Sequence, residues 1–315
     1  MLGYVIRRLL AAIPIALGVS MICFGLVFLA PGDPIQTLLP PDASAETVEQ
    51  LKRLYGLDRP LPVQYLEWLW RVMHGDFGRS IANGRPVIEE IRRSLGNTVL
   101  LATVAVLIAF SIAFVLGVVA GRKSGTWIDR VVTGVAVLGV SVPNYWLGIV
   151  LVIIFSVEMM VLPASGTAGD TFDPTSWEHL QYLVLPVITL SMIPVGIIAR
   201  TTRSAVSEVM NQEFVVTLRA NGLPEWRVLK HAIKNALPPV LAVMGLQFGT
   251  LMGGSILVET VFSWPGSGYL LSKAILTRDV PVLQGAILVL AMIFVVTNLA
   301  VDLFQSTLDP RIRRG

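Results

Sequence analysis

Charged side chains are scarce in this sequence: they make up 14% of its 315 residues, whereas hydrophobic residues make up 54%. The mean hydropathy is +0.71. Such a composition excludes an ordinary soluble domain and is typical of membrane proteins. The net charge of +3 is therefore interpreted through membrane topology, and no nucleic-acid partner is expected.

Side chains that serve enzyme chemistry are scarce as well. Cys23 is the only cysteine and cannot form an internal disulfide bond, and the three histidines are scattered. The sequence has no His-Glu-x-x-His, Cys/His or Gly-x-Ser-x-Gly pattern, and residues 121–125 lack the spacing of a phosphate-binding P-loop. We therefore expect a non-enzymatic chain that holds no metal or cofactor and does not hydrolyse ATP by itself.

Long apolar runs, by contrast, are abundant. Six of them have about the 20 residues needed to cross a hydrocarbon core. They cover residues 9–29, 98–120, 131–157, 180–199, 240–258 and 282–304. The first run is too long for a cleaved signal peptide, and five more follow it. We expect an all-α integral membrane protein with six transmembrane helices.

Basic residues in the short loops predict the orientation. Two arginines precede the first span, three basic residues lie between the second and third, and three arginines follow the sixth. Loops of this kind stay in the cytoplasm, so both termini are expected there. The segment 31–97 is expected outside as a helical insertion, because it is longer than the loops that this rule governs and carries nine acids beside its eight basic residues.

The sequence therefore divides into four parts. The N-terminus and first span cover 1–30, the extracytoplasmic loop 31–97, a five-helix core 98–304, and a cytoplasmic tail 305–315. Within the loop, residues 46–55 and 62–74 are predicted to form amphipathic helices. The second has an aromatic stripe that suits either the membrane interface or a lid over a pore mouth.

One polar stretch, residues 200–239, interrupts the core. Each Lys or Arg at the bilayer centre costs roughly 2.5–3.5 kcal/mol, so a stretch with six of them is expected to lie outside the membrane. Apolar and basic residues alternate at helical spacing over 227–237, which predicts an amphipathic helix. A preceding helix should end at Asn221 and Gly222, and Pro224 with Glu225 suits the start of the next. Such a helical hairpin suits either a contact with a soluble motor or a solvated loop on anionic lipid.

Three residues are candidates for a pathway or gate. Pro143 and Asn144 lie inside the third span, where a proline at depth should bend or unwind the helix; such a break suits either a pathway or packing alone. Glu259 ends the fifth span, where we expect it to be hydrated and structural, although an acid at depth also suggests function. In the same span, Gly245 and Gly249 form a GxxxG pattern that suits either a second subunit or packing within the chain.

The sequence resembles the permease subunits of ATP-binding-cassette importers, in particular the first permease of dipeptide and oligopeptide importers. The resemblance is carried by APGDP at 30–34, YGLDRPLPVQY at 55–65, GDFGRS at 75–80, SVPNYWLG at 141–148, ARTTRSAVSEV at 199–209, ETVFSWPGSGYLL at 259–271 and VDLFQSTLDPRIR at 301–313. It covers nearly the whole chain and implies the type I importer fold.

The resemblance also implies a role for the polar stretch, which is the segment that docks on the ATPase subunit in that family. The residues 219–223 are similar to the family's Arg-Ala-Lys-Gly-Leu turn, whereas residues 216–218 lack the Glu-Ala-Ala of the wider superfamily. The residues implied in ATPase coupling are Arg219, Ala220, Asn221, Gly222, Leu223, Glu225 and Arg227.

The implied assembly contains a second homologous permease subunit, two ATPase subunits that hold ATP and Mg, and an extracytoplasmic binding protein, in the lipid of a bacterial inner membrane. The implied substrates are di- or oligopeptides, with nickel chelates and glutathione as alternatives on the same scaffold. Two other classes stay open: an ion-gradient-driven secondary transporter, although the six runs contain no central acid, and a structural or signalling subunit.

Overall fold

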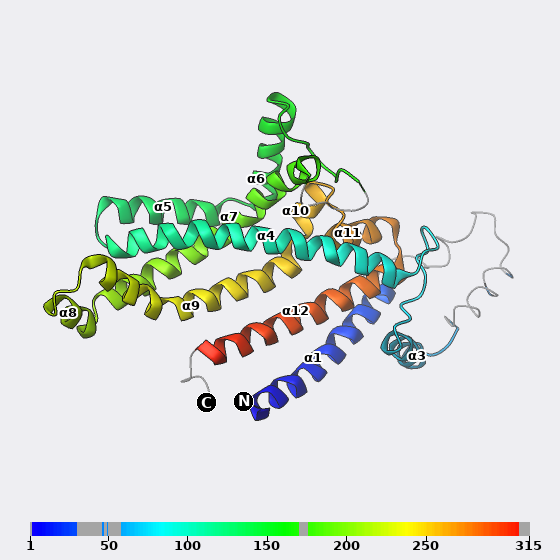
Figure 1. Ribbon diagram of the computed structural model, residues 1–315. Coiled ribbons are helices and arrows are strands. Elements are labelled where there is room, and N and C mark those ends of the chain that lie inside the picture. The colour runs from blue at the N-terminus through cyan, green and yellow to red at the C-terminus, as the bar shows by residue number, and fades with distance from the viewer. Residues whose placement is uncertain (1, 30–45, 47–48, 50–57, 170–175, 309–315) are drawn as a thin grey trace. The chain divides into compact units, whose positions relative to one another are not determined.

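A computed structural model of the chain describes residues 2–29, 46, 49, 58–169 and 176–308 (Figure 1). Apart from a single bridge between Arg79 and Pro86, the regular structure in these ranges is helical, as predicted. The elements are α1 (Leu2–Leu29), α3 (Leu61–Met73), α4 (Val87–Arg122), α5 (Trp127–Ser141), α6 (Asn144–Leu151), the π-helix η1 (Val152–Glu158), α7 (Trp177–Met210), α8 (Glu213–Ala220), α9 (Glu225–Gly254), α10 (Ile256–Val261), α11 (Ser267–Thr277) and α12 (Val280–Leu308).

Four described helices, α4, α7, α9 and α12, are long and apolar enough to cross a membrane. A fifth candidate consists of α5 together with α6 and η1, which are bent by 95° where the first helix ends at Ser141 and the next begins at Asn144. Pro143 caps α6 and has no N–H to continue the helical ladder, so the predicted break in the third span is confirmed. In the described part of α1, the apolar stretch Ile13–Gly25 is shorter than a full span.

Two helices are longer than the sequence predicts. The helix α4 begins at Val87, eleven residues before the predicted start of the second span at residue 98, and continues into that span without a break. The amphipathic helix expected at 227–237 is the beginning of α9, which continues through Pro238 and Pro239 into the fifth span. The predicted helix at 62–74 is confirmed as α3, and the one at 46–55 lies largely outside the described residues.

The described residues form two compact units. One comprises Thr98–Trp264 with the end of α12 from Val296, and α7 is its central helix. In the most apolar stretch of α7, 61% of residues are buried, compared with 33% in α4 and in α9. The helices α5 and α9 pack along it, and their contact residues Ala136 and Val240 share a core cluster with Ile198 of α7.

Glycines permit the closest helix contacts in this unit. A Cβ added at Gly196 of α7 would lie 2.4 Å from the carbonyl oxygen of Ala136 in α5. A Cβ at Gly117 of α4 would lie 2.7 Å from the carbonyl oxygen of Ala199. In α9 a Cβ at Gly245 would meet Val301 of α12 at 2.8 Å, so this glycine of the GxxxG pattern packs within the chain.

The second unit comprises Leu2–Asn97 and Pro265–Val295. The aromatic stripe of α3 is part of its core, because Trp68 packs with Phe24 of α1 and Leu288 of α12. The stripe therefore packs against neighbouring helices of the chain. Neither interpretation from the sequence, a membrane interface or a lid over a pore mouth, predicted this packing. Asp279, 2% exposed, accepts a hydrogen bond from the Ser80 hydroxyl at 2.5 Å and links the loop before α4 to the loop before α12.

Candidate functional site

The turn between α8 and α9 has a defined backbone geometry. The N–H of Leu223 donates to the carbonyl of Leu218 (3.2 Å), and the N–H of Gly222 donates to that of Arg219 (2.9 Å). These two bonds close a Schellman motif, in which the residue after the C-cap must be left-handed. Gly222 has φ +73°, a conformation that glycine adopts without strain. The predicted end of the first helix at Asn221 and Gly222 is confirmed.

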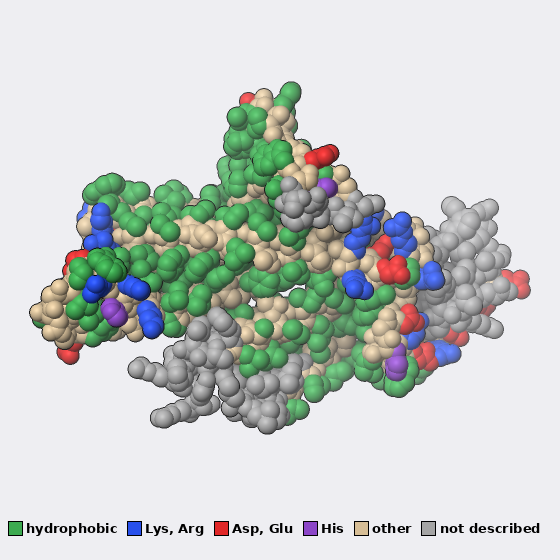
Figure 2. Space-filling model, in the orientation of Figure 1, with side chains coloured by type: hydrophobic (Ala, Val, Ile, Leu, Met, Phe, Trp, Pro, Cys, Tyr) green, Lys and Arg blue, Asp and Glu red, His purple; other side chains and the backbone are tan. Residues whose placement is uncertain are grey.

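The helix α9 begins as predicted, with Pro224 as its N-cap and Glu225 in its first turn. Its buried face consists of Val228, Ala232 and Ala236, each at most 2% exposed. Ala232 and Ala236 pack against Val206 and Val209 of α7. The opposite face is basic and exposed, which confirms the amphipathic pattern; Figure 2 shows the Lys and Arg side chains gathered over α8 and the start of α9.

An ion pair crosses the turn. The Nε of Arg219 donates to Glu225 Oε1 at 2.8 Å and its Nη2 to Oε2 at 3.3 Å. The hydrogen bond, and then the charge of the carboxylate, raise the pKa of Arg219 above its ordinary value. Both side chains are about half exposed, at 43% and 50%, so the pair orders the surface of the turn more than it stabilises the fold.

The structure brings all seven predicted coupling residues to this hairpin, which we define as residues 213–236. Arg219, Glu225 and the turn residues Ala220, Asn221, Gly222 and Leu223 adjoin one another, and the guanidinium of Arg227 lies 5.1 Å from the ring centre of Trp226.

Two exposed apolar side chains of the hairpin were missed by sequence reasoning. Val216 is 63% exposed on α8, and Trp226 is 62% exposed in the first turn of α9. Their neighbour Val215 is fully buried, so α8 has both an inner and an outer apolar face. The available signal was a tryptophan in the most polar stretch of the core, beside a predicted turn.

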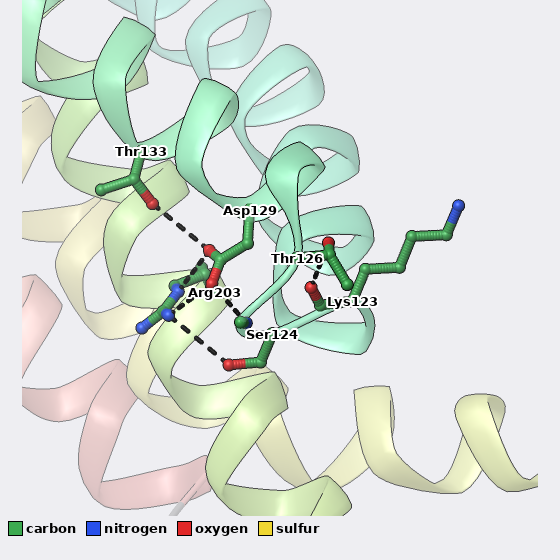
Figure 3. A network of polar contacts seen from close by, with 7 residues as sticks. Lys123, Ser124, Thr126, Asp129, Thr133 and Arg203 are labelled. Carbon is green, nitrogen blue, oxygen red and sulfur yellow. Dashed lines mark hydrogen bonds and ion pairs between the residues drawn. The ribbon is translucent and has the colours of Figure 1, made fainter.

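A second polar network fixes the start of α5 to α7 (Figure 3). Arg203 of α7 donates from Nε to Asp129 Oδ1 (2.8 Å) and from Nη2 to Oδ2 (2.7 Å). The backbone N–H of Gly125 also donates to Oδ2 at 2.9 Å, and the Thr133 hydroxyl lies 3.3 Å from Oδ1. Asp129 is only 4% exposed, and its bidentate contact with arginine satisfies a charge that would be costly to bury alone.

The candidate gate residues lie on two packed elements, α6 and α10. Asn144 begins α6, and its Oδ1 is buried without a hydrogen-bond partner among the described residues. Glu259 of α10 is 0% exposed and accepts bonds from the hydroxyls of Thr98 and Ser255, each at 2.7 Å. Our expectation that this acid is hydrated is wrong, because helices distant in the sequence cover it.

The sequence matches the family described as "Binding-protein-dependent transport system inner membrane component" over residues 113–314, and the N-terminal part of that family over residues 1–102. Dipeptide transport system permease protein DppB of Alkalihalophilus pseudofirmus is 42% identical, with 99% of this chain and 100% of the relative covered. Glutathione transport system permease protein GsiC of Salmonella choleraesuis is 40% identical, with 99% of both chains covered.

A solved structure has the same fold. A chain of the MetNI methionine ABC transporter, in an inward-facing conformation, matches with a TM-score of 0.57 at 17% identity, over 70% of this chain and 96% of that chain. At this identity the match concerns the fold alone. Together with the family match, it identifies the type I ABC importer permease fold. The chain belongs to the binding-protein-dependent transport system inner membrane components, as a multi-pass, non-catalytic permease subunit.

Proposed function

We propose that the chain forms half of the translocation pathway of an ATP-driven peptide importer in a bacterial inner membrane. The full-length similarity to peptide permeases supports this proposal, since a dipeptide permease and a putative peptide permease of Brucella abortus are each 42% identical. We assign six spans, with α1 first and the broken α5–α6 pair third. Both termini are then cytoplasmic, and residues 31–97 form the extracytoplasmic insertion.

The single observation that carries the coupling role is the presence of two exposed apolar side chains on the polar hairpin. Val216 and Trp226 are exposed on a polar segment, where burial against a partner would be favourable. Tryptophan and arginine are enriched among the residues that dominate binding energy at protein interfaces, and Arg227 stacks on this ring. The proposed partner is an ATPase subunit, which would contact these two side chains and the seven coupling residues of the same hairpin.

Movement of the hairpin would reach the spans through two contacts. Its buried face packs on the end of α7, and Arg203 in the same helix holds Asp129 at the start of α5. The helix α5 ends at the Pro143 break, whose backbone discontinuity suits a hinge. In this proposal Pro143 and Asn144 belong to the gate. Glu259 fixes the position of α10, the helix on which α6 packs.

The proposed cycle is alternating access. A binding protein delivers the peptide from outside, a homologous companion permease supplies the other half of the pathway, and two ATPase subunits with ATP and Mg move the hairpins. Membership of a binding-protein-dependent family decides against the ion-gradient-driven alternative.

The test uses the complete importer, reconstituted with its ATPases, companion permease and binding protein. Trp226→Ala should reduce peptide-stimulated ATP hydrolysis and uptake at least about tenfold, because it removes an interface anchor. The purified assembly should melt at an unchanged temperature if hairpin contacts alone are lost. The matched control is Trp177→Ala, a tryptophan 66% exposed at the start of α7, which should retain coupled activity. Equal activity of the two variants would contradict the coupling role.

Glutathione is a second candidate substrate, because glutathione permeases are 40% identical over the whole chain. A nickel chelate is the third. Competition for uptake of a labelled dipeptide distinguishes them: unlabelled di- and tripeptides should compete, and glutathione or a nickel chelate should not. Competition by glutathione alone would move the assignment to the glutathione branch.

A further inference from the structure

A cavity of about 620 Å³ opens beside the ion pair between α5 and α7, and neither the coupling role nor the gate uses it. Its wall changes character along α5. Asp129, Arg130 and Thr133 are polar, whereas Gly134, Val137 and Leu138 present an apolar surface. From Arg130 to Leu138 the helix rises about 12 Å, so the open cavity has a polar end, which we call its mouth, and an apolar end.

The accessible charge at the mouth is positive. Asp129 is 4% exposed and both its oxygens already accept hydrogen bonds, two of them from Arg203. The Arg203 side chain remains 34% exposed, and no bond of its Nη1 is found among the described residues. Arg130 is exposed and likewise makes no side-chain bond within the described ranges. Two guanidinium groups are thus available to an anion, a geometry that suits phosphate oxygens.

The apolar end of the cavity suits a hydrocarbon chain. Val137 and Leu138 are 44% and 65% exposed, and nothing lies within 4 Å of the position of a Cβ on Gly134. Trp127, 70% exposed in the first turn of α5, is the residue type that lies at the membrane–water boundary. The basic residues of the preceding loop place this end of α5 on the cytoplasmic side in the proposed topology.

We propose that this cavity binds an anionic phospholipid of the cytoplasmic leaflet, with Arg130 and Arg203 holding the phosphate and an acyl chain lying over Gly134, Val137 and Leu138. The apolar wall lies on a helix assigned to a membrane span, so a lipid supplies both the phosphate and the acyl chain that covers this wall, whereas a free phosphate ion occupies the mouth alone. Net negative charge is favoured because the mouth carries two cations and its one acid is already paired. The bound lipid would also bridge α5 to α7 beside the helix end that carries the hairpin.

The test measures lipid retention by the delipidated, purified importer complex. Phosphatidylglycerol and phosphatidylcholine with the same chains are added at equal concentration, and retained lipid is counted by native mass spectrometry. We expect preferential retention of phosphatidylglycerol and a higher melting temperature with that lipid. Inorganic phosphate at the same concentration should produce neither effect.

Three variants locate the site. Arg130→Gln should weaken phosphatidylglycerol retention about fivefold, the effect of one basic residue near an anionic surface. Lys123→Gln is the matched control, because this lysine lies in the turn just before α5 but extends away from the network (Figure 3) and should change retention little. Gly134→Leu places a larger side chain in the cavity, at a position where a Cβ meets no heavy atom within 4 Å, and should reduce retention of both lipids.

Equal retention of the two lipids, or equal effects of the Arg130 and Lys123 variants, would overturn the proposal. Stabilisation by inorganic phosphate alone would assign the cavity to a free anion and would also overturn it. None of these outcomes depends on which substrate the importer carries.

Discussion

The middle of α7 and the hairpin that follows it differ in how much of their surface the chain covers. At Gly196 and Ile198, which are both buried, neighbouring helices approach to backbone contact. In the hairpin, the inner face is equally buried, but Val216 and Trp226 are more than 60% exposed. The difference separates two kinds of role: substitutions in the middle should change stability, and substitutions on the outer face of the hairpin should change coupling alone.

Gly196→Ala is expected to have the largest effect on stability. The new Cβ would lie 2.4 Å from the carbonyl oxygen of Ala136 and 2.6 Å from Val140 Cγ2. A backbone oxygen cannot move without shifting α5, so the cost should be about 3 kcal/mol or more. Thermal unfolding of the purified protein in detergent measures it.

Gly134→Ala in α5 is the control for that substitution. No heavy atom lies within 4 Å of its Cβ position, so alanine should be neutral or stabilise the helix by up to about 1 kcal/mol. A wild-type melting temperature for Gly196→Ala would show that α5 and α7 are not in contact as described.

Glu259→Ala is the second prediction and concerns the buried acid of α10. The substitution leaves the hydroxyls of Thr98 and Ser255, which are at most 2% exposed, without this acceptor, at a cost of about 2–3 kcal/mol. Glu259→Gln keeps an acceptor oxygen in place and should cost clearly less. If the two variants have the same melting temperature, these hydrogen bonds do not account for the stability that Glu259 contributes.

The third prediction compares two ion pairs. A double-mutant cycle with Asp129→Asn and Arg203→Gln should give a coupling energy of about 1–2 kcal/mol, because the acid is buried while a third of the arginine is exposed. The same cycle on Arg219 and Glu225 should give a coupling close to the measurement error, and salt should reduce it further. A larger coupling energy in the exposed pair would contradict the expectation that the buried ion pair between α5 and α7 contributes more to stability than the ion pair of the hairpin.

Local signals in the sequence were sufficient to predict the hairpin. The 3.6-residue periodicity placed the basic face, and Gly222 and Pro224 placed the turn, because each of these residues restricts its own backbone. The break at Pro143 was predictable for the same reason. Continuation of α9 through Pro238 and Pro239 was not, because packing on α7 outweighs the local tendency of proline to end a helix.

Contacts between distant residues were beyond the sequence. Asp129 and Arg203 are 74 residues apart, and no local pattern around either residue indicates that the two are in contact. Glu259 was judged from its place near the end of a span, but its burial depends on Thr98, 161 residues away. The spacing of Gly117 and Gly121 was visible, yet only the structure shows that these two glycines face α7.

A small loss of stability is expected at Gly222, where a side chain has room but the backbone conformation does not suit one. No heavy atom lies within 4 Å of its Cβ position, so the cost arises from φ +73° alone. Gly222→Ala should destabilise by about 1 kcal/mol, and Gly222→Asn by less, because asparagine tolerates the left-handed region. Gly222→Val should be worse than either, since a β-branched side chain in this region is strained. Peptide-stimulated ATP hydrolysis should follow the same order, Asn above Ala above Val, because the proposed docking on the ATPase needs the turn that this conformation closes. If the valine variant kept full coupled activity, docking of the ATPase would not depend on the conformation of this turn.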